Sequence, residues 1–260
     1  MHDTPVWDPF PYVHQHLFDS ENLQNHWARL HDGDQEPLPL DPEVLQAWVL
    51  YHCGEFEAAF RAGRLLGPAG YAVMNKACLI QADYLERNEA ARLNLYFDTA
   101  ERAKAHMAAE PGNPNAHYFY GYALGRYSQS TSVAQALVKG YGEKIKTAFE
   151  TAIALNPRHA DAHIALGSFH AEVIDKVGAM IGNITYGAKR ETALHHFRTG
   201  LALIPRAAIA LTEYARGLLM LDIEQFESEA MCLYEQAAAV QPLDAMEHLG
   251  VLQVQAELAS

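Results

Sequence analysis

The sequence is poor in cysteine, in positive charge and in long apolar runs. Its three cysteines, Cys53, Cys78 and Cys232, are too scattered for a disulfide framework or a zinc site, so we expect reduced thiols. The 19 Lys and Arg residues are outnumbered by 32 Asp and Glu, and the formal charge of −13 argues against a nucleic-acid or an anionic-membrane surface. No window holds about 18 uncharged apolar residues in succession, and the first residues lack the basic and apolar regions of a signal peptide. These absences predict a soluble protein of the cytoplasm.

Three prolines end segments that share one helical pattern, with an aromatic residue eight positions before the proline and a small residue five positions before it. The prolines are Pro157, Pro205 and Pro242, the aromatic residues are Phe149, Phe197 and Tyr234, and the small residues are Ala152, Gly200 and Ala237. This pattern is typical of the second helix of a tetratricopeptide repeat (TPR), in which small residues let two helices approach and a ring fills the space between units. Gly121 and Gly167 lie ten residues beyond Pro111 and Pro157, where the first helix of the repeat has a small contact residue.

These patterns predict an all-α fold, a right-handed α-α superhelix of TPR-like helix pairs, over residues 41–260. The repeats are best supported over residues 112–250, and a weaker unit covers Leu45–Gly67. Residues 1–40 interleave prolines with aromatic residues, and we expect an N-terminal cap or arm that covers the first exposed apolar face. An arm that reaches a second subunit, giving a homodimer, is the alternative.

Two consecutive units are longer than an ordinary repeat. The spacing is 46 residues from Pro111 to Pro157 and 48 from Pro157 to Pro205, against about 34 for a TPR. The motif Tyr-Gly-x-Lys, at Tyr141 and again at Tyr186, ends both insertions. We expect both first helices to run about three turns past their usual length, with stops at Gly140 and at the Gly182-Asn183 pair.

The lengthened units carry polar residues that we expect on the concave face as partner-binding residues. They are Tyr118, Tyr122, Arg126, Tyr127 and Gln129 in one unit and His170, Asp175 and Lys176 in the next. Lys176 also lies four residues after Glu172, which fits a plain surface ion pair. Cations at the starts of second helices oppose the helix dipole and are possible anion contacts. These are Lys144, Lys189 and Arg190, and the plainer interpretation pairs them with Glu143 and Glu191.

The fourteen histidines raise the question of a metal site. His159 and His163 are four residues apart and His170 follows seven later on the same helical face, but Ala160 stands where a zincin motif has glutamate. No nucleophile–base pairing stands out either. We therefore predict no metal, no cofactor and no enzymatic activity.

The stretch from Asn113 to Pro205 resembles the regulator of microtubule dynamics family and the related T-component proteins of TRAP transporters. The motifs are "KIKTAFETAIALNPRHADAHIALGSFHAEV", the long insertion, and "ETALHHFRTGLALIP". The resemblance implies a helical repeat scaffold without catalysis that works through a partner or ligand in its central groove. Residues 1–110 match neither family clearly, and without a lipoprotein signal or a membrane anchor the transporter and microtubule roles are not carried over.

The function favoured by the sequence is a TPR-type scaffold or adaptor that binds a protein segment or peptide in its concave groove. The alternative is a carrier of a small-molecule or lipid-like ligand. A carrier would need a closed apolar cavity between the lengthened helices, near Phe169, Val173, Val177 and Ile181.

Overall fold

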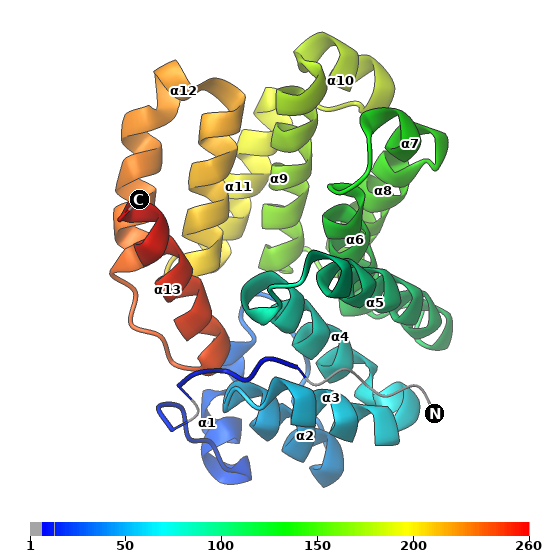
Figure 1. The fold of residues 1–260 in the computed structure, drawn as a ribbon, viewed down its shortest axis with the longest axis vertical. Coiled ribbons are helices and arrows are strands. Elements are labelled where there is room, and N and C mark those ends of the chain that lie inside the picture. The colour runs from blue at the N-terminus through cyan, green and yellow to red at the C-terminus, as the bar shows by residue number, and fades with distance from the viewer. Residues whose placement is uncertain (1–6, 13, 260) are drawn as a thin grey trace.

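The computed structural model describes residues 7–12 and 14–259, and within them the regular structure is helical, without a strand (Figure 1). Consecutive helices pack in pairs. The pairs are α2 (Pro42–His52) with α3 (Phe56–Leu65), α4 (Tyr71–Ile80) with α5 (Glu89–Ala109), α6 (Pro114–Ser128) with α8 (Tyr141–Leu155), and α9 (Ala160–Val177) with α11 (Arg190–Leu203). The predicted all-α superhelix of helix pairs is confirmed.

Further helices complete the two ends of the array. Near the C-terminus, α12 (Ala208–Ala238) is two helices joined at Asp222, whose φ of −174° and ψ of 98° are not helical. The last helix, α13 (Ala245–Leu258), packs against α12. At the other end, α1 (Ser20–Leu30) packs on α2, and one π-helical turn, Gln81–Leu85, follows α4.

The small residues and rings of the repeat pattern interlock as predicted. A Cβ atom on Gly121 would stand 2.8 Å from Cε1 of Phe149, and one on Gly167 would stand 2.9 Å from Cδ1 of Phe197. Phe197 is fully buried and stacks on Tyr214 of α12 at a centroid distance of 5.1 Å. Each ring therefore fills space that only a missing side chain leaves open, and truncating such a ring typically costs about 3–5 kcal/mol.

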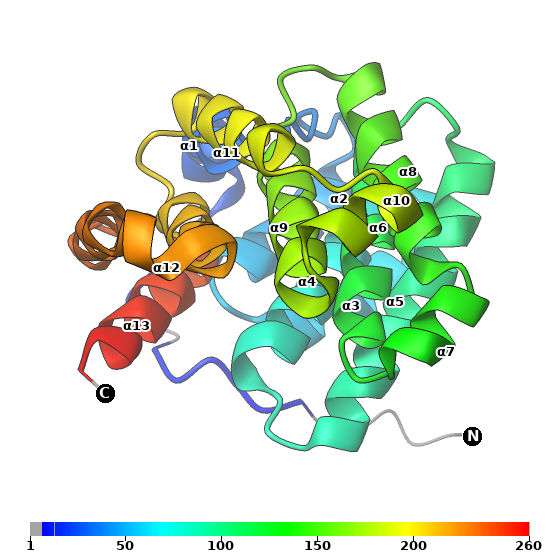
Figure 2. The same ribbon diagram turned by 90° about the horizontal axis from the view of Figure 1, so that it is seen from above.

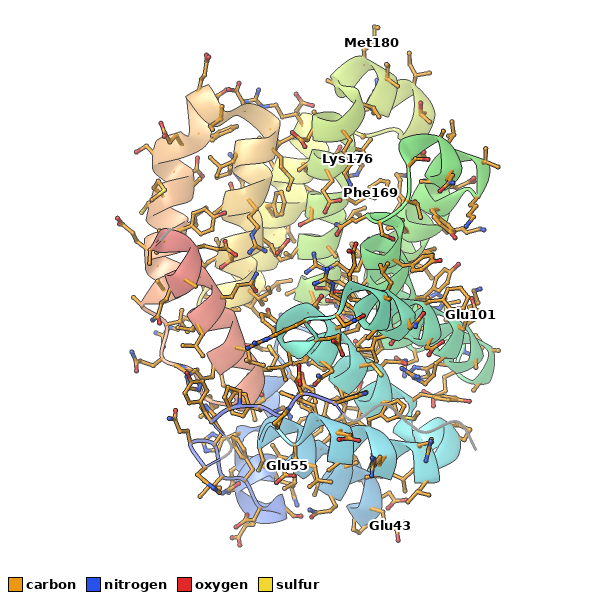
Figure 3. The ribbon with its side chains drawn as sticks, in the orientation of Figure 1. Glu43, Glu55, Glu101, Phe169, Lys176 and Met180 are labelled. Carbon is orange, nitrogen blue, oxygen red and sulfur yellow. The ribbon has the colours of Figure 1, made fainter. Side chains whose placement is uncertain are left out.

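The two insertions form separate short helices, so the expectation that both first helices run about three turns past their usual length is wrong. They are α7 (Val133–Val138) and α10 (Ala179–Tyr186), which lie at the same end of the molecule (Figures 1 and 2). The predicted stop at Gly182 is also wrong, because Gly182 is buried inside α10. Met180 of α10 points away from the body of the fold (Figure 3) and is 75% exposed.

The local sequence explains both breaks. After α6, the hydroxyls of Ser128 and Thr131 donate to backbone carbonyls three residues earlier, at 2.8 and 2.7 Å, and Ser132 caps α7. Such bonds compete with helix continuation. After α9, Gly178 adopts φ +81° and ψ 155°, and Gly187 ends α10 in the left-handed region at φ +67°. Residues with a side chain rarely adopt these conformations.

The described part of the N-terminal segment packs on its own chain. Trp7 and Phe10 are buried, and the Phe10 ring meets Phe56 of α3 and His248 of α13. Pro5 lies outside the described residues. The segment thus belongs to the same hydrophobic core as α2 and α3.

Contacts at the base of the fold join its first helices to its last. Arg29 of α1 pairs with Glu247 of α13 at 2.7 Å. The His52 Nδ1 atom donates to Asp244 at 2.6 Å, where the carboxylate also caps α13 through the Glu247 N–H. The two ends of the helical array are therefore tied together (Figure 1).

Candidate functional site

A cavity of about 540 Å3 lies between the first helices of successive pairs. Its lining comes from α4, α6, α9 and α12, with contributions from α7, α8 and α10. Phe169, Val173 and Val177 on α9 and Tyr118 and Tyr122 on α6 give it largely apolar and aromatic walls. The cavity therefore lies on the inner face of the helical array.

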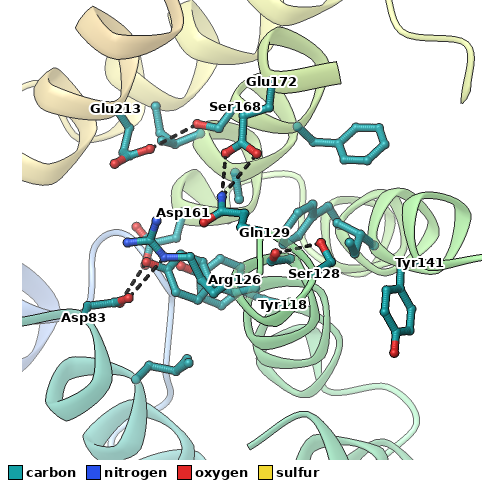
Figure 4. Close-up of a pocket in the computed structure, with 18 of the residues that line it drawn as sticks. Asp83, Tyr118, Arg126, Ser128, Gln129, Tyr141, Asp161, Ser168, Glu172 and Glu213 are labelled. Carbon is teal, nitrogen blue, oxygen red and sulfur yellow. Dashed lines mark hydrogen bonds and ion pairs between the residues drawn. The ribbon is translucent and has the colours of Figure 1, made fainter. Parts of the chain in front are cut away.

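Asp83 anchors one side of the cavity (Figure 4). It accepts hydrogen bonds from Tyr96 Oη at 2.6 Å and Tyr122 Oη at 2.9 Å, and it pairs with Arg126 Nε at 3.1 Å. The Arg126 guanidinium also lies over the Tyr122 ring, 5.6 Å from its centroid. Burial raises the pKa of Tyr122 well above its usual value, so its hydroxyl stays a donor to Asp83. Asp83 therefore has three partners inside the fold.

The opposite rim is held by contacts between α6, α9 and α12. Gln129 Nε2 donates to both carboxylate oxygens of Glu172 at 3.0 and 3.2 Å, and Lys176 pairs with Glu172 at 3.5 Å. Ser168 donates to Glu213 at 3.4 Å (Figure 4). Gln129 and Lys176 are exposed, so the cavity opens to solvent at this rim.

Asp161 lines the cavity at the start of α9. Its backbone N–H donates to the Gly33 carbonyl at 3.1 Å, which places the first turn of α9 against the N-terminal segment. Burial, and then the nearby Asp34, raise the pKa of Asp161 to about 7, while Lys76 opposes the shift. No donor among the described residues makes a hydrogen bond to its carboxylate.

A chain of buried polar groups runs from the cavity floor to α13. Lys76 pairs with Asp34, whose other oxygen accepts from His31 Nδ1 at 2.9 Å. His31 Nε2 then lies 3.2 Å from His52 Nε2, and His52 Nδ1 meets Asp244 at 2.6 Å. Burial alone would raise the pKa of Asp34, but Lys76 and His31 hold it well below its usual value. Because carboxylates accept, the Nδ1 atom of each ring carries the hydrogen of its bond to the carboxylate.

Of the eight predicted partner-binding residues, five line the cavity. They are Tyr118, Tyr122, Arg126, Gln129 and Lys176. Tyr127, His170 and Asp175 are not part of the lining: Tyr127 packs between Phe97 and Tyr141. Whether the five bind a partner stays a prediction.

The periodicity of α9 explains the other two placements. The residues of this helix that face the cavity recur every three or four positions, from Ser168 to Glu172 and Lys176. His170 falls on a different face, where it is buried and stacks on His196 of α11. Asp175 is exposed to solvent. The expectation that they point into the cleft is corrected accordingly.

None of the three possible anion contacts is among the cavity-lining residues. Lys144 is exposed and donates to the Lys139 carbonyl at 2.9 Å. Lys189 is exposed at the N-cap of α11. Arg190 pairs with Asp222 at 3.3 Å, so its acidic neighbour comes from α12 and not from Glu191.

The cavity agrees in part with the carrier alternative. Phe169, Val173 and Val177 line it as that alternative requires, but Ile181 does not and is 54% exposed. The chain turns at Gly178, which moves Ile181 out of line with α9. The cavity is also open at its rim, and not closed.

Sequence reasoning missed the charged residues Lys76, Asp83, Asp161 and Glu213, all of which line the cavity. They come from three different helical units, and no local spacing connects them. Asp161 has the appearance of an ordinary acidic residue in the first turn of a helix. Its cavity position follows from the packing of α9 against α6 and α12, which a sequence pattern does not give.

Several of the histidines take part in packing and capping. His159 accepts from the Ala162 N–H as the N-cap of α9 and bonds to Asn115 at 2.8 Å, while His163 meets His196 at 2.9 Å. In the part of the chain that the structure describes, no group of three or more His, Cys, Asp or Glu residues is arranged to hold a metal ion.

Paired helices that interlock through small residues and rings, around a cavity lined by α4, α6, α9 and α12, define a TPR-like superhelix. Among solved structures, the chain is similar to TTC0263, a thermophilic TPR protein of Thermus thermophilus. The TM-score is 0.57 at 18% identity, and the match covers 82% of this chain and 97% of that one. A likeness at this identity supports the fold alone.

The sequence profile of the family "Regulator of microtubule dynamics protein 1-3" matches residues 71–242. The chain belongs to this family. The match begins well before the stretch that carries the sequence resemblance, so the expectation that residues 1–110 match neither family is wrong for residues 71–110. A search of curated proteins gives no match. None of the described helices is both long and apolar enough to cross a membrane.

Proposed function

We propose that the protein is a non-catalytic TPR-type adaptor that holds a segment of a partner protein along its inner groove, with a side chain of the segment inside the cavity. The observation that carries the proposal is the position of the cavity on the first helices α4, α6, α9 and α12. In repeat stacks of this kind, the inner helices present the binding surface. A volume of about 540 Å3 suits a side chain or small group and excludes a folded domain.

The polar residues of the cavity support a binding role for its rim. Arg126 is fixed by Asp83 and Tyr122, and Gln129 and Lys176 are fixed by Glu172, so these groups are held in place before a partner arrives. Preorganised groups lose less side-chain entropy on binding. The formal charge of −13 favours a partner segment with basic residues.

Site-directed photocrosslinking in the protein's own lysate tests the proposal. A photoreactive amino acid at Gln129, on the rim, is expected to crosslink one stretch of one partner, which mass spectrometry identifies. The same group at Glu227, an exposed residue of α12 outside the cavity lining, is the matched control and is expected to give no such product. A synthetic peptide of the crosslinked stretch should compete with the product. The double variant Arg126→Ala with Lys176→Ala should lose the capture.

The carrier alternative is favoured by the apolar patch of Phe169, Val173 and Val177. Native mass spectrometry of the purified protein separates the two functions. A ligand of a few hundred daltons that is lost on denaturation, together with no crosslink at position 129, would overturn the adaptor and establish the carrier.

A further inference from the structure

The charges that line the cavity are paired, with one exception. Among the described lining residues, the cations are Lys76, Arg126 and Lys176, and each lies within ion-pair distance of a carboxylate. The carboxylates are Asp83, Asp161, Glu172 and Glu213. Asp83 and Glu172 pair with lining cations, and Glu213 pairs with Arg216 at 2.7 Å. Asp161 is left without an ion-pair partner.

The position of Asp161 keeps it unpaired. Its carboxylate packs against the Cα of Gly33, where a Cβ atom would stand 3.0 Å from Asp161 Cγ. The groups that face it are Asp32 and Asp34 of the N-terminal segment and Lys76 of α4. Lys76 is neutralised by its own pair with Asp34, so the surroundings of Asp161 favour an additional cation.

The cavity walls suit the stem of a cationic side chain. Tyr118, Tyr122, Phe149 and Phe169 belong to the same cavity lining as Asp161. Aromatic faces attract cations, and lysine and arginine side chains bury their methylene stems along apolar surface. A cavity with largely aromatic walls and one unpaired carboxylate in its lining therefore matches a long side chain with a positive end.

We propose that the cavity receives a lysine or arginine side chain of the partner segment, whose charged end pairs with Asp161. This inference rests on the proposed adaptor function and specifies its recognition chemistry. The shift of the Asp161 pKa to about 7 is consistent with it, because a poorly solvated carboxyl without a cation holds its proton and a bound cation stabilises its ionised form. The overall negative charge of the chain would attract such a segment over a longer range.

Pentylamine and pentan-1-ol test the inference without knowledge of the partner. Both have the length of a lysine side chain counted from its Cα atom, and the first is positively charged at neutral pH. Titration followed by amide NMR is expected to show pentylamine bound at residues around Asp161 about tenfold more tightly than the alcohol at pH 8. The preference should shrink at pH 6, where Asp161 is protonated.

Two variants assign the effect to one carboxylate. Asp161→Asn imitates the protonated acid and should abolish the preference for the amine while leaving binding of the alcohol. Asp175→Asn, on the exposed face of the same helix, is the matched control and should keep the preference. If Asp161→Asn does not fold, the pH dependence of the wild-type chain decides.

The outcomes separate the two proposals. Equal binding of amine and alcohol at pH 8, or an undiminished preference in Asp161→Asn, overturns the inference. A partner segment that crosslinks at position 129 but binds equally well after its lysines and arginines are replaced also overturns it, and leaves the adaptor function standing. An absence of any crosslinked segment overturns the adaptor function itself.

Discussion

The ring of Tyr186 lies against Gly142, so the two copies of the Tyr-Gly-x-Lys motif touch each other. A Cβ atom on Gly142 would stand 2.8 Å from Cδ1 of Tyr186 and 3.0 Å from its Cζ. Tyr186 ends α10 and Gly142 lies in the first turn of α8, and both line the cavity. The repeated motif therefore joins the two insertions at one end of the cavity.

This contact predicts that Gly142→Ala destabilises the protein. The added methyl group forces the Tyr186 ring to move, at a cost of about 1–3 kcal/mol that outweighs the gain in helix propensity. In a Tyr186→Ala background the same substitution should be neutral or stabilising. Gly125→Ala is the control, because a Cβ there meets a first atom at 4.0 Å, and it should stabilise by about 0.5–1 kcal/mol. Urea unfolding of the double-mutant cycle measures the coupling, and additive effects would contradict the prediction.

Because Asp244 contacts the buried His52, we expect its loss to destabilise the protein more than the loss of Asp41, the N-cap of α2. Asp244→Ala should cost about 3–5 kcal/mol, because it removes the cap of α13 and leaves His52 without its carboxylate. Asp41→Ala removes the exposed cap of α2, whose carboxylate accepts from the Glu43 N–H, and should cost about 1 kcal/mol. Thermal and urea unfolding of both variants check the ratio. Equal losses would mean that the contact between Asp244 and His52 adds nothing.

Buried titratable groups predict a maximum of stability close to pH 6.5. Burial lowers the pKa of four histidines to about 4, namely His31, His159, His170 and His196. Below pH 6.5 the unfolded chain binds protons that these rings refuse, so stability falls as the pH drops towards 4. Burial raises the pKa of Glu36 to about 8 and that of Asp161 to about 7. The folded chain therefore holds protons that the unfolded chain has released. Above pH 6.5 this effect dominates, and stability falls as the pH rises to 8.

Urea midpoints between pH 5 and pH 8.5 test both limbs. Glu36→Gln keeps a neutral group beside Asn115 and should weaken the decline above pH 6.5. Because unfolded Glu36 ionises from about pH 4.5 upward, the variant should also steepen the acid limb above that pH and move the maximum to a higher pH. A wild-type midpoint that still rises through pH 8 would contradict the assignment of buried neutral carboxyls.

We expect alanine substitutions of the glycines that end α9 and α10 to lower stability, by amounts that depend on the backbone conformation. Gly178→Ala and Gly187→Ala place a side chain at positive φ, where each should cost about 1–3 kcal/mol although the space around both is open. Gly187→Asn should recover much of the loss, since asparagine tolerates the left-handed region. Gly112→Ala, also in open space but without positive φ, is the control and should be near neutral. Melting temperatures of the four variants decide the order.

The repeat architecture could be predicted because its determinants are local and periodic. Gly121 and Phe149, or Gly167 and Phe197, occupy fixed positions relative to the prolines, and their contacts follow from that spacing. The first helices do not extend through the insertions, and for the first insertion the sequence contains the reason. The run Ser128 to Ser132 offers hydroxyl groups to the backbone, and this competition outweighed the apolar pattern.

The sequence allowed the position of the cavity to be predicted, but not the charged residues that line it. First-helix residues such as Tyr122 and Arg126 belong to a recognisable face, whereas their partner Asp83 comes from a π-helical turn of the preceding unit. The surroundings of the Asp161 carboxylate are set by Gly33 and Lys76, which are far away in the sequence. Side-chain pairs of this kind depend on how the superhelix closes, and local periodicity does not encode that.

The ties between α1, α2 and α13 bear on how the protein comes apart. In an open solenoid each unit contacts its neighbours, so terminal units fray first and unfolding spreads inward. Here the first and last units hold each other through His52 with Asp244 and Arg29 with Glu247. Loss of α13 thus removes support from α2, and loss of α2 removes support from α13. We therefore expect the helical array to unfold cooperatively in one step. The cavity should keep its shape until the whole array unfolds.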